Sequence, residues 1–266
     1  PYILKSNDKG RTWVSIASNL PENGNVHTIA QDFVKKDLLF VGTEFAFYFT
    51  IDGGQEWKKL SGGMPDVAVR DIAIQEKEND LVVATFGRGF YILDDYSSLR
   101  DLETSFFDKD AYIFPIADAL MYVQTGARYG QGSMPYYGEN PKFGAVFTYY
   151  LKDVPETTVK ERKKLEKEQF EKGEKIHQPT VAELEAEERQ LAPYLVFTVR
   201  DEVGNVVREF FEKASKGINQ EVWNLRYAGA NTFGGDKFNP TFDKDRGGFP
   251  IMPGTYSVSM DLVFNG

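Results

Sequence analysis

A repeat of about 43 residues in the first hundred positions restricts the fold of this chain more than any other feature of its sequence. An eight-residue motif, Ser/Thr-x-Asp-x-Gly-x-x-Trp, fills residues 6–13 and returns 44 positions later. Two apolar segments return 43 positions later, with residues 37–41 matching 80–84 and residues 47–49 matching 90–92. Alternating apolar and polar residues between turn residues predict about four short strands in each unit. Such a unit is typical of one blade of a β-propeller.

The eight-residue motif is a turn signature. Its Asp side chain can accept the backbone N–H groups of the same turn, and its Gly supplies a position of positive φ. Its Trp can bury a large ring between neighbouring sheets. We expect these residues to hold turns rather than to act as catalytic carboxylates or calcium ligands, because a repeated motif serves every blade alike. They are Ser6, Asp8, Gly10 and Trp13 in the first copy, and Thr50, Asp52, Gly54 and Trp57 in the second.

The motif resembles the Asp-box, the neuraminidase repeat of sialidases and sortilin-type propellers. Residues 84–95 lead into a third copy that lacks Gly-x-x-Trp, and they resemble the last propeller blade of large bacterial sortilin-like proteins, often named glycosyl hydrolases with neuraminidase repeats. This resemblance implies that the chain leaves the propeller here for a C-terminal β-sandwich. It also implies that Asp-boxes lie on the rim, away from the central pocket, and that the protein is exported to the periplasm, the cell surface or the medium.

Blade counting gives a further expectation. The chain holds the end of one blade, one whole blade and three strands of another, whereas a closed propeller needs about four to eight blades. The chain also opens and ends within alternating patterns, so we expect it to be part of a longer polypeptide. The remaining blades would come from that polypeptide or from another chain.

The second half predicts an antiparallel sandwich. Strands are expected at 144–152, 194–200, 206–211, 221–227 and 255–264, with a hairpin turn at 201–205. Residues 217–226 and 252–256 resemble immunoglobulin- or fibronectin-III-like modules of bacterial exported proteins.

A charged stretch interrupts this sandwich. Thr158-x-x-Glu161 and Thr180-x-x-Glu183 both match the capping box and predict helices at about 159–172 and 181–191. Apolar residues are sparse there: Leu165, Phe170, Val181, Leu184 and Leu191. We expect a solvated hairpin on the sandwich surface, and a protruding arm that binds a partner is the alternative.

Composition excludes several classes of function. With 40 Asp+Glu against 31 Lys+Arg, the net charge of −9 makes nucleic acid a poor partner. The sequence has no cysteine, only two histidines (His27 and His177) and no apolar run long enough to span a bilayer. Residues 130–133 do not form a phosphate-binding loop, and residues 243–247 hint at a calcium loop whose twelfth position is Gly254 instead of Glu. We therefore expect neither a cofactor nor a metal.

Candidates for chemistry are few. Glu44 and Arg88 fall in corresponding inter-strand turns and are the nearest candidates for a site facing the propeller channel, although solvated hairpin residues are the simpler interpretation. An aromatic cluster can fill a junction or stack on sugars, and we expect the first role. Its members are Tyr122, Tyr129, Tyr136, Tyr137, Phe143, Tyr149 and Tyr150.

These observations predict an all-β fold. A partial Asp-box propeller of about two blades would occupy residues 1–104, and an immunoglobulin- or fibronectin-III-like sandwich would occupy residues 105–266, with the two-helix insertion at about 153–192. We expect the C-terminal, non-catalytic segment of an exported propeller protein, acting as a scaffold or recognition module for protein or glycan. One alternative is a sialidase-like glycoside hydrolase whose active site lies in blades outside this chain. Another is a ring closed by blades from several copies.

Overall fold

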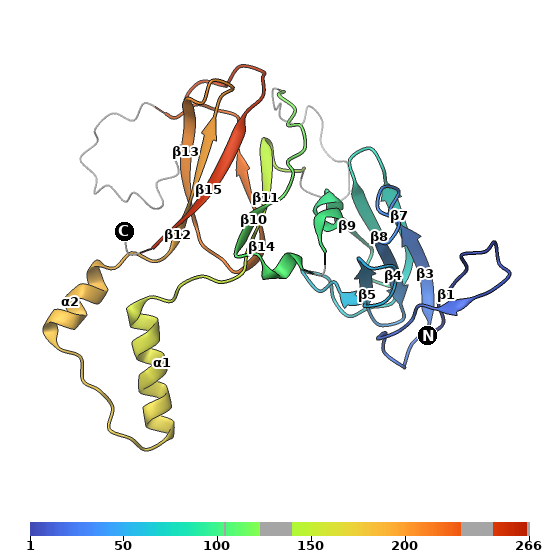
Figure 1. The fold of residues 1–266 in the computed structure, drawn as a ribbon, viewed down its shortest axis with the longest axis horizontal. Coiled ribbons are helices and arrows are strands. Elements are labelled where there is room, and N and C mark those ends of the chain that lie inside the picture. The colour runs from blue at the N-terminus through green and yellow to red at the C-terminus, as the bar shows by residue number, and fades with distance from the viewer. Residues whose placement is uncertain (104, 123–139, 230–246, 265–266) are drawn as a thin grey trace, which may run out of the picture. The chain divides into compact units, whose positions relative to one another are not determined.

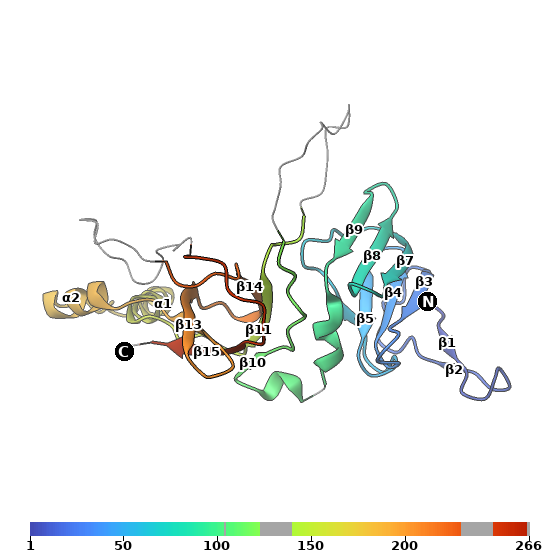
Figure 2. The same ribbon diagram turned by 90° about the horizontal axis from the view of Figure 1, so that it is seen from above.

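The computed structural model describes the chain except for residue 104 and residues 123–139, 230–246 and 265–266. The described residues form several small antiparallel sheets with few helices, so the fold belongs to the all-β class. The chain divides into two compact units, Pro1–Asp108 (unit 1) and Lys109–Gly266 (unit 2). Figures 1 and 2 show unit 1 in blue to green and unit 2 in green to red.

Unit 1 contains a hairpin and two larger antiparallel sheets. The hairpin pairs β1 (Leu4–Lys5) with β2 (Val14–Ser15). The second sheet has the order β3 (Val26–Gln31), β4 (Leu39–Thr43), β5 (Phe47–Thr50) and β6 (Lys58–Lys59). The third sheet has the order β7 (Val69–Gln75), β8 (Asp80–Thr85) and β9 (Phe90–Leu93). The chain then enters the 3-10 helices η1 (Tyr96–Asp101) and η2 (Phe106–Asp108).

The two larger sheets repeat one another, with one correction to the alignment made from the sequence. Thr43 and Thr85 close equivalent turns, since the Thr43 hydroxyl donates to the carbonyl of Ala46 at 2.9 Å and the Thr85 hydroxyl to the carbonyl of Gly89 at 2.7 Å. The β8–β9 turn therefore has one residue more than the β4–β5 turn. Strand β8 matches β4 at a spacing of 42 residues, not the predicted 43, because the β7–β8 connection is one residue shorter than the β3–β4 connection. The longer β8–β9 turn restores the spacing of 43 between β5 and β9.

Side chains from the first two sheets of unit 1 form a common core. Ile3 beside β1 and Leu20 after β2 are buried with Leu39 and Val41 of β4 and with Trp57 just before β6. Leu39 and Val41 lie on the same face of the four-stranded sheet, because alternate side chains of a strand point to the same side.

Unit 2 has two three-stranded antiparallel sheets that share one hydrophobic core. One has the order β10 (Ala111–Ile113), β11 (Ala145–Leu151) and β14 (Gly217–Trp223), and the other has the order β13 (Val206–Lys213), β12 (Tyr194–Arg200) and β15 (Ser257–Val263). Phe197 of β12 lies 5.3 Å from Tyr149 of β11, between ring centroids. The strand predicted at 221–227 instead ends at Trp223, because Leu225 has a φ of 55° and leaves extended geometry.

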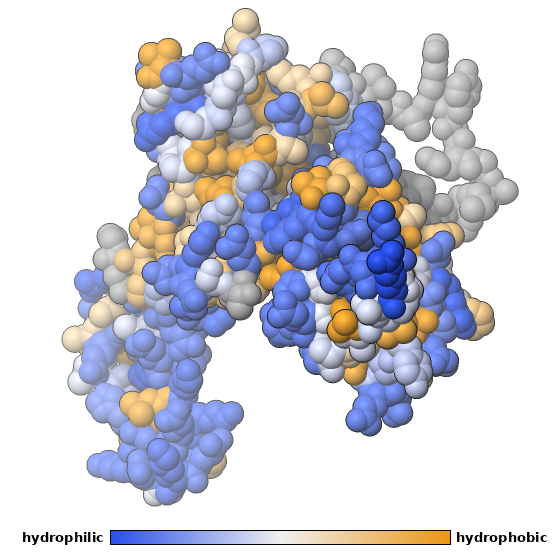
Figure 3. All heavy atoms as spheres, turned by 45° about the vertical axis from the view of Figure 1, so that its right-hand side comes forward, coloured by the Kyte–Doolittle hydropathy of each residue, from blue (hydrophilic) through white to orange (hydrophobic). Residues whose placement is uncertain are grey.

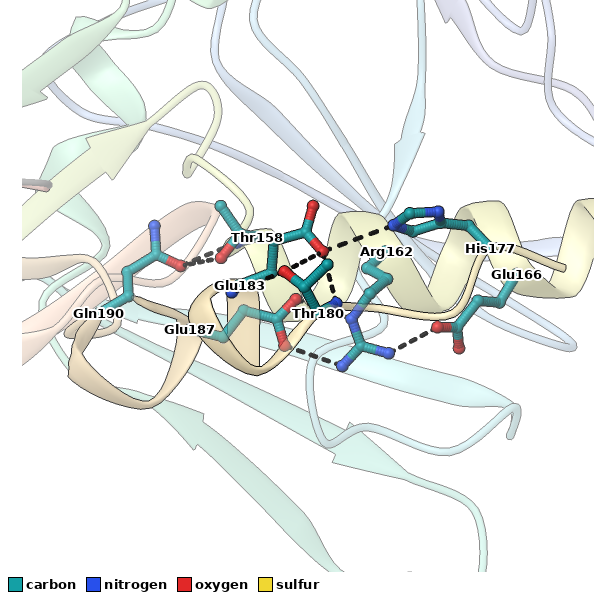
Figure 4. Close-up of polar contacts among 8 residues, drawn as sticks. All are labelled: Thr158, Arg162, Glu166, His177, Thr180, Glu183, Glu187 and Gln190. Atoms are coloured by element: carbon teal, nitrogen blue, oxygen red, sulfur yellow. Dashed lines mark hydrogen bonds and ion pairs between the residues drawn. The ribbon is translucent and has the colours of Figure 1, made fainter. Parts of the chain in front are cut away.

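Helices α1 (Thr158–Glu171) and α2 (Val181–Arg189) lie between β11 and β12 in the sequence, and we call residues 158–189 the helical arm. Arg162 joins the helices through ion pairs to Glu187 at 2.7 Å and, within α1, to Glu166 at 2.5 Å (Figure 4). Figure 3 shows a mostly hydrophilic arm at the lower left. Neither helix has a buried residue, and the Arg162–Glu187 ion pair is a polar contact between them.

The two predicted capping boxes have different outcomes. The box at Thr180 and Glu183 forms, with reciprocal bonds between side chains and backbone. The box at Thr158 does not form, because α1 begins one residue earlier at the N-cap Thr157 and the Thr158 hydroxyl donates to Gln190 at 2.8 Å. None of the described helices has the length and apolar character that a membrane-spanning helix requires.

Candidate functional site

The first copy of the eight-residue motif forms a closed turn around Asp8. Its carboxylate accepts the backbone N–H of Thr12 at 2.8 Å, the Thr12 hydroxyl at 2.7 Å and the Ser6 hydroxyl at 2.9 Å. Gly10 has a φ of 85° and donates its N–H to the Ser6 hydroxyl at 2.7 Å. The bonds from Thr12 hold the pKa of Asp8 at about 2, well below the ordinary carboxyl value. This carboxylate is engaged by its own turn.

The second copy repeats this network around Asp52. The carboxylate accepts the Thr50 hydroxyl at 2.5 Å and the backbone N–H groups of Gln55 at 2.9 Å and Glu56 at 3.1 Å. Burial has the largest single effect and raises the pKa of Asp52, but these hydrogen bonds together outweigh it, so the pKa lies below the ordinary value. Gly54, with a φ of 98°, takes the place that Gly10 has in the first turn.

The two motif tryptophans differ sharply in burial. The Trp57 ring is 3% exposed and its indole N–H donates to the carbonyl of Ile16 at 2.7 Å. Trp13 is 59% exposed and bonds only within its own turn, to the carbonyl of Gly10 at 3.1 Å. The expectation that both rings are buried between sheets therefore fails for Trp13, because no described sheet covers that side of the β1–β2 hairpin.

Polar side chains at the starts of β3 and β7 meet across the two larger sheets of unit 1. The Arg70 guanidinium lies 3.3 Å from the His27 ring, and the Thr28 hydroxyl donates to the Asp71 carboxylate at 3.4 Å. Each pair is separated by 43 residues, so equivalent positions of the repeat touch. We call His27, Thr28, Arg70 and Asp71 the inner-strand row, and Arg70 and Asp71 are exposed to solvent.

The turns beside this row contain the two residues that the sequence suggested for a channel site. Glu44 is exposed in the β4–β5 turn, where its carboxylate accepts the backbone N–H of Asn25 at 3.4 Å. Arg88 is exposed in the β8–β9 turn. No described contact joins Glu44 to Arg88. Phe86 is in the same turn as Arg88, and its ring centroid lies 5.2 Å from the central carbon of the Arg70 guanidinium. The Phe86 ring therefore adds an aromatic face beside the inner-strand row.

A buried ionic cluster, which the sequence did not reveal, lies elsewhere in unit 1. Asp32 follows β3, and its fully buried carboxylate binds Arg100 of η1 through both guanidinium arms, at 2.8 and 3.0 Å. The Tyr96 hydroxyl donates to the same carboxylate at 2.5 Å. Lys35 donates its ammonium to the carbonyls of Arg100 at 2.8 Å and Leu102 at 2.7 Å. We call Asp32, Lys35, Tyr96 and Arg100 the Asp32 cluster.

The cluster attaches η1 to the β3–β4 loop. Burial raises the pKa of Asp32, but bonds from Arg100, the Lys35 backbone and Tyr96 outweigh it, so the carboxyl pKa is lowered. Burial and the neighbouring carboxylate raise the pKa of Tyr96, which therefore stays a neutral donor. The Asp32 carboxylate, the Tyr96 hydroxyl and the Lys35 ammonium all bind groups inside the protein, so we interpret this arrangement as structural. Its partners lie more than 60 residues apart without any motif, so no sequence signal marks them.

Unit 2 has a mainly apolar cavity of about 560 Å³ among its described residues. Trp223 and Tyr256 line it with their rings 5.5 Å apart. Of the predicted aromatic cluster, Tyr149 and Tyr150 are buried, and Tyr122 packs edge-on against Phe143. The other members, Tyr129, Tyr136 and Tyr137, lie outside the described residues.

Acidic side chains bear on both carboxylate and metal chemistry in the described part of the chain. Burial, followed by the charge of Asp80, raises the pKa of Asp94. The described residues contain no group of three or more His, Cys, Asp or Glu side chains placed to hold a metal. Most of the calcium loop considered at 243–247, like the segment 130–133, lies outside the described residues.

Comparison with known proteins finds no family model, no curated protein and no solved structure that matches this chain.

Proposed function

We propose that this chain is a non-catalytic scaffold and recognition segment of an exported Asp-box propeller protein. In this proposal the two larger sheets of unit 1 are successive blades, the β1–β2 hairpin is the end of a preceding blade, and unit 2 is an immunoglobulin- or fibronectin-III-like sandwich. Support comes from the repeat itself, because two copies of one motif fold into the same hydrogen-bonded turn. Contacts between residues 43 positions apart add to this support.

One observation favours recognition over catalysis. The motif carboxylates of Asp8 and Asp52 are engaged within their own turns, whereas Arg70 and Asp71 of the inner-strand row are open to solvent. In a propeller, the first strand of each blade lines the central channel, so the row would lie at the channel. Arg70 offers fixed donors, Asp71 offers acceptors, and Phe86 offers a ring face. This combination suits a hydroxyl-rich or carboxylate-bearing ligand, such as a glycan or an acidic protein surface.

The alternative, a sialidase-like hydrolase, requires two opposed carboxylates or a comparable nucleophile set. Within the described residues, Glu44 and Arg88, the nearest candidates for chemistry, lie in separate turns and no described contact joins them. The alternative therefore places its active site in blades outside this chain.

Replacing Arg70 by alanine should weaken glycan binding by about tenfold or more, because a charged hydrogen bond contributes about 1.5–3 kcal/mol. The measurement is binding of the whole chain to an array of neutral and carboxylate-bearing glycans. Arg11→Ala, which removes an exposed arginine at a variable position inside the first motif, is the matched control and should leave binding unchanged.

The same protein should hydrolyse neither sialosides nor neutral aryl glycosides. Turnover that disappears in Glu44→Gln would favour the hydrolase instead. Absence of both binding and turnover would contradict glycan recognition by this row.

A further inference from the structure

The two larger sheets of unit 1 place equivalent side chains in opposite environments. In the four-stranded sheet, Phe40, Phe47 and Phe49 share one face and are 0%, 1% and 9% exposed. Their equivalents in the three-stranded sheet are Val82, Phe90 and Ile92, and the last two are 75% and 61% exposed. We call Val82, Ala84, Phe90 and Ile92, which pair across β8 and β9, the open face.

The chain itself shows what covers such a face. Strand β7 packs against β3 and β4, and the approach at Gly42 is so close that a Cβ there would lie 2.5 Å from the Val69 side chain. The ring of Tyr96 packs edge-on against Phe40 at 5.2 Å. The covering sheet presents small and branched apolar residues, since Val69, Leu81 and Val83 are all at most 3% exposed. One blade therefore buries the aromatic face of the blade before it.

The open face also has an unfilled edge. In the four-stranded sheet, β6 pairs with β5, and Leu60 extends this pairing by donating its N–H to the Phe47 carbonyl at 3.0 Å. Strand β9 pairs only with β8 among the described strands. After Leu93 the chain enters η1, whose Arg100 is bound by Asp32. Among the described residues of unit 1, no strand pairs with the second edge of β9, and Phe90 and Ile92 of the open face are exposed.

We infer that the open face binds a further blade of the same repeat, one that presents a face of leucine and valine like that of Val69, Leu81 and Val83. This inference rests on the proposed propeller and identifies the surface where its ring closes. An exposed apolar surface of this kind marks an interaction site, and the covered face in the same chain defines the chemistry of its occupant.

The test adds blades to the intact chain. Pro1 is equivalent to Phe45, as Ser6 is to Thr50, so copies of residues 1–44 placed before Pro1 continue the repeat in register. Adding up to about six copies covers the known range of blade numbers. Because the chain has no cysteine, Ile92→Cys is a unique thiol whose labelling rate reports cover of the open face. Phe49→Cys, at the equivalent covered position, is the matched control.

Labelling of Ile92→Cys should be fast in the unextended chain and should fall to the slow rate of Phe49→Cys at one particular number of added blades. Circular dichroism checks that each extended chain is folded. A fast rate at every length would overturn the inference, and so would a slow rate in the unextended chain.

A second readout separates this inference from the proposed function. Ile92→Lys should leave the melting temperature of the unextended chain unchanged and lower it at the ring-closing length. If it lowers the melting temperature equally in both, the open face is not a docking surface, yet glycan binding through Arg70 can still hold. Loss of glycan binding with normal closure would contradict only the proposed function.

Discussion

Trp57→Ala is expected to lower the free energy of unfolding of unit 1 by about 3–5 kcal/mol. The Trp57 ring is 3% exposed in the core with Ile3, Leu39 and Val41, and its indole N–H satisfies the carbonyl of Ile16. Truncation leaves a cavity and removes that donor. Urea unfolding of the intact chain, followed by far-UV circular dichroism, measures the change.

Trp13→Ala provides a matched control from the other copy of the same motif. Its ring is 59% exposed, so the same truncation should change the free energy of unfolding by only about 0.5 kcal/mol. Equal losses at the two positions would show that Trp13 is buried in solution and that the description of the β1–β2 hairpin is wrong.

Asp32→Ala is expected to destabilise unit 1 by about 3–5 kcal/mol, because it leaves the Arg100 guanidinium largely buried without its carboxylate. The Tyr96 hydroxyl and the Lys35 backbone N–H lose their acceptor at the same time. The control is Asp153→Ala, which breaks an exposed ion pair with Lys216 and should change stability little.

The effect of Asp32 depends on pH in a defined direction. Its pKa in the folded state lies below the ordinary value of 3.8, so its contribution is fully present above pH 3.8. Below that pH the contribution is lost progressively as the folded-state carboxyl becomes protonated. The stability difference between the wild type and Asp32→Asn should therefore be constant at neutral pH and shrink in acid. A difference that grows below pH 3.8 would be incompatible with the lowered pKa.

Much of unit 1 can be predicted from local patterns. Turn chemistry depends on residues four positions apart, so the Ser6–Thr12 and Thr50–Glu56 networks follow from the motif alone. Strand alternation in the repeat likewise indicates which residues face a core. The spacing of 42 for β8 could not be predicted, because the β7–β8 connection is one residue shorter than the β3–β4 connection and the β8–β9 turn is one residue longer than the β4–β5 turn. The two changes cancel at β9, so the apolar pattern is preserved.

Features that depend on distant partners escape such reasoning. Asp32 and Arg100 lie 68 positions apart, and nothing near either residue marks it as buried and paired. The exposure of Trp13 depends on what lies beside its hairpin, not on its motif. The N-cap of α1 shifts to Thr157 because Gln190 captures the Thr158 hydroxyl, a contact across 32 residues. The inner-strand row could have been found from the repeat, since its members are themselves 43 positions apart.

We propose that the two larger sheets of unit 1 are adjacent copies of one propeller blade, with equivalent inner strands in contact. Disulfide formation between Thr28→Cys and Asp71→Cys in the otherwise cysteine-free chain tests it most directly, because these side chains lie 3.4 Å apart. The control pairs Thr28→Cys with Gln75→Cys, four residues and about 13 Å further along β7. Mass spectrometry after mild oxidation should find an intramolecular disulfide in the first protein and little in the second. Equal yields, or none in either, would contradict the claim.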